Sequence, residues 1–134
     1  MTKKRILVAE DDAALLKATK VRLEHEGYHV ITAVDGEDVL QQAASELPIH
    51  LIVLDIKMPK LDGYEVCQRL KRQPGTAAVP IIVVTGWEPQ LSRLADRCIE
   101  VGAEDWLQKP YHAQELLAKI HRALGEGEQE GSHG

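Results

Sequence analysis

The sequence is poor in residues that cross-link or stack. It contains two cysteines, no phenylalanine, two tryptophans and three tyrosines among 134 residues. Cys67 and Cys98 each stand alone in a helix-like pattern, so neither a disulfide framework nor a cysteine zinc site is expected, and a reducing, cytoplasmic location fits. The longest apolar runs, at 51–54 and 81–84, are far too short to span a bilayer. No positively charged start leads into an apolar stretch long enough for a signal peptide.

Positive charge is in the minority. Lysine and arginine number 16 against 21 aspartates and glutamates, which gives a formal net charge of −5. No basic stripe is present to replace the counterions of phosphate, so nucleic acid is not expected as a direct ligand, and neither is a membrane. Hydrophobic residues make up 44% and charged residues 28%, values typical of one soluble globular domain.

Short apolar runs alternate with helix-like patterns along the chain. Continuous apolar strands indicate burial on both faces, hence a parallel sheet with helices on each side. We therefore predict an α/β fold with a five-stranded doubly wound parallel sheet, a flavodoxin-like three-layer sandwich. The domain should cover 1–124, because 125–134 contain no apolar side chain and should form a disordered tail or the start of a linker. The expected strands are 5–9, 29–33, 50–54, 81–84 and 104–107, and the expected helices 13–26, 36–47, one around Val66 and Leu70, 91–101 and 113–124.

Polar side chains follow four of the five predicted strands, at the edge where open parallel sheets bind ligands. Three converging carboxylates need a cation, and magnesium prefers oxygen ligands and keeps part of its water shell. A carboxylate beside magnesium and a lysine is suited to accept a phosphoryl group, which a nearby hydroxyl can then bond. Taken singly, two acids before a helix are commonly an N-cap, so the combination carries the argument. The residues at these strand ends are Glu10, Asp11, Asp12, Asp55, Thr85 and Lys109.

Four motifs in order match one known family. The chain resembles the receiver domain of bacterial two-component response regulators, a superfamily called CheY-like, over roughly residues 4–124. Each motif is weak alone, but four in the right order with matching strands are highly specific. The motifs are ILVAEDD at 6–12, LIVLDIKMPKLDGYE at 51–65, PIIVVTG at 80–86 and GAEDWLQKP at 102–110.

The resemblance implies a role for each residue at the strand ends. Asp55 corresponds to the phosphoacceptor, which attacks a phosphohistidine. Asp12 corresponds to the direct ligand of Mg²⁺, for which Mn²⁺ can substitute, with Asp11 acting through water and the backbone carbonyl of Lys57 as a further ligand. Lys109 pairs with Asp55 and then with the phosphoryl group. The resemblance also implies a cis bond between Lys109 and Pro110, which proline makes accessible.

The resemblance further implies a switch. Thr85 bonds the phosphoryl oxygen and moves inward, and an aromatic side chain of the last strand, here Trp106, fills the space it leaves. The output face is then the fourth helix, the fifth strand and the fifth helix. The implied partners are a histidine kinase or phosphotransfer protein as donor and a downstream protein or output domain, with pairing of two copies on phosphorylation as a further expectation.

Other functions remain as alternatives. A haloacid-dehalogenase-type magnesium phosphatase also uses an aspartate nucleophile, but it needs a second aspartate two positions later, where this chain has Lys57. A flavodoxin needs a phosphate-binding loop after the first strand, where this chain is acidic. A degenerate receiver that only binds partners would not need its acceptor residues. This chain retains them, which argues against that alternative. We therefore expect a signalling domain rather than a turnover enzyme, either free-standing or part of a larger regulator.

Two large side chains flank the predicted acceptor and hydroxyl. Lys57 stands two residues after Asp55, and Trp87 stands two after Thr85, in a segment slightly longer than is common in the family. A long cation and a bulky ring hinder an attacking water, so we predict slow autodephosphorylation that Lys57→Ala or Trp87→Ala accelerates. Loss of the phosphoryl group, followed over time by intact mass, checks this. A wild-type half-life of seconds that neither substitution changes would contradict it.

Overall fold

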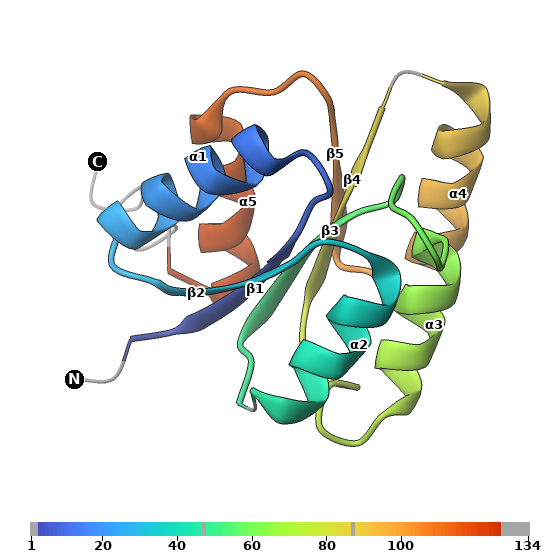
Figure 1. Ribbon diagram of the computed structural model, residues 1–134, viewed down its shortest axis with the longest axis horizontal. Helices are drawn as coiled ribbons and strands as arrows, with labels where there is room; N and C mark the ends of the chain where they lie inside the picture. The colour runs from blue at the N-terminus through green and yellow to red at the C-terminus, as the bar shows by residue number, and fades with distance from the viewer. Residues whose placement is uncertain (1–2, 47, 87, 127–134) are drawn as a thin grey trace.

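The computed structural model describes residues 3–46, 48–86 and 88–126, and contains one parallel sheet between two layers of helices (Figure 1). The strand order is β2-β1-β3-β4-β5, with every neighbouring pair parallel, which confirms the predicted doubly wound fold. The strands are β1 (Arg5–Ala9), β2 (His29–Ala33), β3 (Leu51–Asp55), β4 (Ile81–Thr85) and β5 (Asp105–Gln108). The helices are α1 (Ala13–His25), α2 (Gly36–Ser45), α3 (Gly63–Arg72), α4 (Pro89–Glu100) and α5 (Ala113–Leu124).

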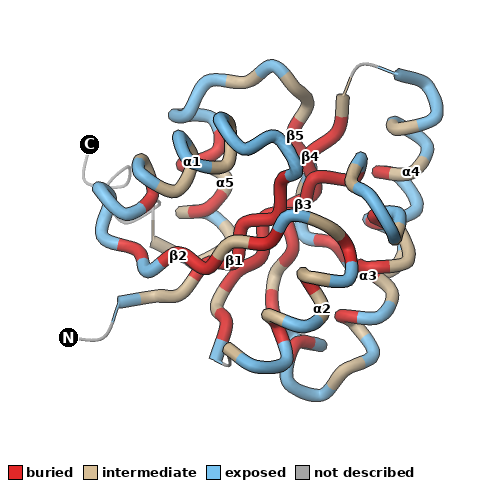
Figure 2. Tube along the Cα trace, in the orientation of Figure 1, coloured by how far each residue is buried: buried red, intermediate tan, exposed pale blue. Residues whose placement is uncertain are grey.

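The sheet separates two apolar cores. Helices α1 and α5 cover one face, and α2, α3 and α4 cover the other (Figure 1). Every residue of β3 and β4 is buried, which explains why these strands read as continuous apolar runs (Figure 2). Because all five strands run the same way, their carboxyl ends meet at one edge, and that edge carries the predicted site.

Element boundaries shift by one or two residues from those predicted. Helix α4 begins at Pro89, because a proline in the first helical turn loses no hydrogen bond. At the other end of the chain, Gly125 adopts the left-handed conformation (φ 72°) that ends α5, and the Glu126 carboxylate accepts a hydrogen bond from Tyr28 at 2.7 Å. Structure therefore continues to residue 126, two residues into the predicted tail, and 127–134 lie outside the described residues.

The first three helices each begin at an aspartate. The side chains of Asp12, Asp35 and Asp62 accept hydrogen bonds from backbone N–H groups three residues later, at 3.1, 2.8 and 2.8 Å. After Asp62 the chain passes close to the loop that follows β3, since a Cβ at Gly63 would lie 2.9 Å from the Ile56 Cα. These caps fix where the loops at the site end and where the helices start.

Removal of one cap should weaken the fold measurably. We expect Asp62→Ala to lower the free energy of unfolding by about 1 kcal/mol, because the Glu65 N–H loses its partner. Asp62→Asn keeps an acceptor oxygen and should stay within about 0.5 kcal/mol of wild type. Urea denaturation followed by circular dichroism checks both. Equal stability of the two variants would contradict the capping role.

Candidate acceptor site

A cavity of about 400 Å³ opens at the carboxyl edge of the sheet. The ends of β1, β3 and β5 supply its polar lining through Glu10, Asp55 and Lys109, and the start of α4 supplies Glu88 and Leu91. Carboxylates and one ammonium therefore face a space large enough for a phosphoryl group and several water molecules.

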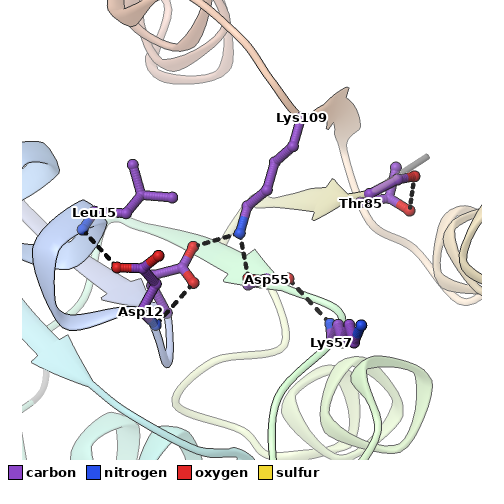
Figure 3. A network of polar contacts seen from close by, with 8 residues as sticks. Asp12, Leu15, Asp55, Lys57, Thr85 and Lys109 are labelled. Atoms are coloured by element: carbon purple, nitrogen blue, oxygen red, sulfur yellow. Dashed lines mark hydrogen bonds and ion pairs between the residues drawn. The ribbon is translucent and has the colours of Figure 1, made fainter.

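Asp55 lines this cavity and is only 3% exposed. Its Oδ1 accepts a hydrogen bond from the backbone N–H of Lys57 at 3.0 Å, and its Oδ2 accepts one from the Lys109 Nζ at 2.8 Å (Figure 3). Both oxygens are therefore held in place before any substrate arrives. This is the arrangement that a carboxylate nucleophile requires.

Lys109 joins two carboxylates. Its Nζ donates to Glu10 Oε1 as well as to Asp55 Oδ2, both at 2.8 Å. Burial by itself lowers the pKa of Lys109, but the hydrogen bonds to Asp55 and Glu10 outweigh burial and raise it, so the side chain stays charged. The backbone N–H of Lys109 donates to the Thr85 carbonyl at 2.7 Å, and the peptide bond to Pro110 is cis.

Sequence reasoning placed Glu10 at the strand end but gave it no role in the site. Glu10 is 5% exposed, and this burial raises the pKa of its carboxyl. The hydrogen bonds from Lys109 and from the Asp12 N–H act in the opposite direction and lower that pKa, but burial outweighs them. Carboxylate oxygens of Glu10, Asp11 and Asp55 lie within 4.8 Å of one another. Such a set of oxygen donors fits a hard divalent cation such as Mg²⁺.

Asp12 lines the same cavity but does not belong to the group of three close carboxylates. The structure brings together the predicted Asp11 and Asp55, but the Asp12 Oδ1 accepts from the Leu15 N–H and caps α1 (Figure 3). The apolar run ends at Ala9, so Glu10 is the residue at the strand end. The three-residue spacing from Asp12 to Leu15 is an N-cap signal that was present in the sequence.

Thr85 and Trp106 are not engaged with the acceptor in this structure. Thr85 is 2% exposed, and its hydroxyl donates to the neighbouring Gly86 carbonyl at 3.3 Å (Figure 3). Trp106 is 47% exposed and pairs in register with Val83, two residues before Thr85 on β4. The predicted switch pair therefore lies on adjoining strands, with the indole directed to the surface.

Lys57 extends away from the acceptor. Its side chain is 74% exposed, and its Nζ lies 3.8 Å from the Glu88 Oε1 at the start of α4. Lys57 would therefore hinder an attacking water from the rim of the cavity. Trp87, the other half of that prediction, lies outside the described residues.

Comparison with known proteins decides the family. The family model for the response regulator receiver domain matches residues 6–121 of the chain. The chain belongs to the response regulator receiver family. The family and the fold are therefore those that the resemblance implied.

Relatives of this receiver are transcriptional regulators. A probable transcriptional regulator ycf27 of Porphyridium aerugineum is 44% identical over 126 residues, 92% of the chain and 49% of the relative. The alkaline phosphatase synthesis transcriptional regulatory protein PhoP of Bacillus subtilis is 38% identical over 125 residues, 93% of the chain and 50% of the relative. The chain thus spans about half the length of these relatives, which are signalling proteins rather than turnover enzymes.

Solved receiver structures share the whole fold. The receiver domain protein (CheY-like) of Methanospirillum hungatei is 32% identical, with a TM-score of 0.85 over 96% of this chain and 99% of that one. The receiver domain of the sensor histidine kinase PA1611 of Pseudomonas aeruginosa has a TM-score of 0.82 at 29% identity, over 93% and 100% of the two chains, and its structure holds magnesium in the active site cleft. In the described part of this receiver, no helix is long and apolar enough to cross a bilayer.

Removing the ammonium should destabilise the site. In Lys109→Met, Glu10 and Asp55 lose their shared partner. At neutral pH and without divalent cation, we expect the free energy of unfolding to fall by about 2–3 kcal/mol. This is less than the cost of breaking a fully buried ion pair, because the lysine side chain is 28% exposed. In a Glu10→Gln background the same substitution should cost less, because one carboxylate is already neutral. Urea denaturation of the four proteins measures this coupling. An equal cost in both backgrounds would show that the bridge is not the cause.

Proposed function

We propose that this receiver accepts a phosphoryl group on Asp55 from a phosphohistidine of a partner kinase or phosphotransfer protein. The observation that carries the proposal is the Asp55 carboxylate, buried at the end of the central strand and held between the Lys57 N–H and the Lys109 ammonium. The open cavity above it admits a donor side chain. Glu10 is also buried and hydrogen-bonded through both oxygens, so the choice of Asp55 rests in addition on its place at the end of the central strand β3.

The transfer step is a displacement at phosphorus. A carboxylate oxygen of Asp55 attacks the phosphorus, the P–N bond to the donor imidazole breaks, and the bonding electron pair leaves with the imidazole nitrogen. Lys109 holds the acceptor and then a phosphoryl oxygen, so positive charge is present throughout the step. When bound by Glu10, Asp11, Asp55 and the Lys57 carbonyl, Mg²⁺ supplies further charge neutralisation on the phosphoryl oxygens, and Mn²⁺ can substitute for it.

Phosphorylation then favours a second conformation. The added oxygens need hydrogen-bond donors, and the Thr85 hydroxyl at the end of β4 now donates only to a neighbouring carbonyl. Its movement toward the phosphoryl group would leave room for the exposed Trp106 to turn inward. A differential stabilisation of a few kcal/mol is enough to shift such an equilibrium. The face formed by α4, β5 and α5 then carries the change to a partner, an output domain or a second copy.

The protein acts as a cytoplasmic switch and not as a phosphatase of external substrates. Two residues after Asp55 stands Lys57, at the position where an aspartate-nucleophile phosphatase needs an aspartate as its general acid and base. Its relatives include a DNA-binding dual master transcriptional regulator, RpaA of Synechocystis, which this chain matches over 48% of that protein. DNA contact therefore belongs to an output domain beyond the receiver, since the receiver itself carries net negative charge.

Intact mass tests the acceptor directly. After incubation with acetyl phosphate and MgCl₂, we expect the wild type to gain one phosphoryl group and Asp55→Asn to gain none. Omission of magnesium or addition of EDTA should suppress the reaction, because charge on the phosphoryl oxygens is then less neutralised. No gain in the wild type, or an equal gain in Asp55→Asn, would favour a phosphorylation-independent binding module.

A matched pair of variants tests the metal site. Asp11→Asn removes a carboxylate of the three-residue group and should lose most magnesium-dependent phosphorylation. Asp12→Asn keeps an oxygen that can cap α1 and should keep most of it. Magnesium titration followed by tryptophan fluorescence gives the affinity of each variant. The reverse ranking would restore Asp12 as the direct ligand, and the Asp55→Asn result above would still decide the acceptor.

A further inference from the structure

The loop that follows the acceptor is held against the start of α2. This loop covers residues 56–62 and contains Lys57, whose backbone N–H binds the Asp55 carboxylate. Gly36, the first residue of α2, donates its N–H to the Pro59 carbonyl at 3.2 Å. The first N–H groups of a helix have no partner within the helix, so this one is free to bind the loop. No described residue of α2 lines the cavity, so the contact calls for a separate explanation.

Gly36 is buried, and the loop lies so close to it that no side chain fits there. A Cβ on Gly36 would lie 2.6 Å from the Leu61 Cβ and 2.9 Å from the Leu61 carbonyl oxygen. Non-bonded carbon atoms pack at about 3.5–4.0 Å, so a methyl group at this position must displace either the loop or the helix. Neither atom of Leu61 can turn aside as the end of a long side chain can. The glycine therefore sets how closely the loop approaches α2.

Lys60 gives independent evidence that α2 holds the loop. Its φ is 77°, in the left-handed region that residues with a side chain rarely adopt. Its Nζ lies 3.5 Å from the Asp35 Oδ2 and 3.8 Å from the Glu37 Oε1, on either side of Gly36 in the sequence. Exposed ion pairs of this kind contribute little by themselves, but an unfavourable backbone conformation persists only where the surrounding contacts determine it.

The first residue of the loop is fixed to the sheet. The Ile56 N–H donates to the Val84 carbonyl of β4 at 2.9 Å, and the chain at Gly63 closes on the Ile56 Cα. Lys57 lies between this fixed point and the turn that contacts α2. A displacement of that turn therefore changes the position of the Lys57 peptide groups.

We propose that Gly36 is a positioning residue for the acceptor site and acts through the loop 56–62. Because it has no side chain, α2 holds the loop where the Lys57 N–H orients the Asp55 carboxylate and where the Lys57 carbonyl can serve as a magnesium ligand. A larger residue at position 36 displaces the loop, and both groups move with it. The inference rests on the proposed function, since it assigns Gly36 to the metal and acceptor chemistry stated there.

Magnesium affinity and NMR of the loop test this role. In Gly36→Ala we expect the dissociation constant for magnesium to rise about tenfold, an effect typical of residues that orient metal ligands. The amide resonance of Lys57 should also shift in the metal-free protein. Titration of magnesium followed by tryptophan fluorescence gives the affinity, and a ¹⁵N correlation spectrum gives the shift.

A second substitution in α2 serves as the control. Ala43 is buried two turns further along the helix, and Ala43→Gly lowers the stability of α2 without adding an atom against the loop. Urea denaturation should show this loss, whereas the magnesium affinity and the Lys57 resonance should stay close to those of the wild type. A merely structural role of Gly36 would change the free energy of unfolding and leave both readouts unchanged.

The outcomes separate this inference from the proposed function. Wild-type magnesium affinity in Gly36→Ala, or an equal loss in Ala43→Gly, would overturn the inference and leave the acceptor intact. A wild type that binds no magnesium would overturn the metal site and this inference with it. If Gly36→Ala does not fold, the wild type decides alone. Coupling is reciprocal, so magnesium should slow hydrogen exchange at the Gly36 N–H, and an unchanged exchange rate would contradict the role.

Discussion

One ammonium group between two buried carboxylates is the interaction on which the site depends. Lys109 Nζ lies 2.8 Å from oxygens of both Glu10 and Asp55. Two carboxylates at this depth repel each other and lose hydration, and the lysine offsets both costs. One lysine cannot neutralise all three carboxylates once Asp11 is counted, so the cavity keeps a surplus of negative charge. Such a surplus on oxygen ligands favours the binding of a divalent cation.

The fold makes this arrangement possible by bringing distant strand ends to one edge. Glu10, Asp55 and Lys109 follow or end β1, β3 and β5, which run parallel in the same sheet. Apolar burial on both faces of β3 holds the acceptor strand rigid. The chain leaves β1 toward one face and β3 toward the other, and the crevice that opens between the two connections is where ligands of such sheets bind.

Helix α4 connects the site with the rest of the molecule. It reaches the cavity at its first residues, where Glu88 lies 3.8 Å from Lys57, and it packs against α3 in a core that contains both cysteines. The ion pair at the rim is exposed and weak, whereas the contact between α3 and α4 is buried, so the buried contact contributes more to holding α4 in place.

The sequence by itself determined the fold and the edge that carries the site, because continuous apolar runs and helical periods of three and four report burial directly. Local spacing also contained the cap at Asp12, but a carboxylate can cap a helix or bind a metal, and only the tertiary structure showed that Glu10 takes the place beside Lys109. The surface position of Trp106 and the burial of Cys67 and Cys98 in one core likewise depend on how separate elements pack. Such pairings are long-range, and a one-dimensional pattern specifies the face of an element but not the residue it meets on another.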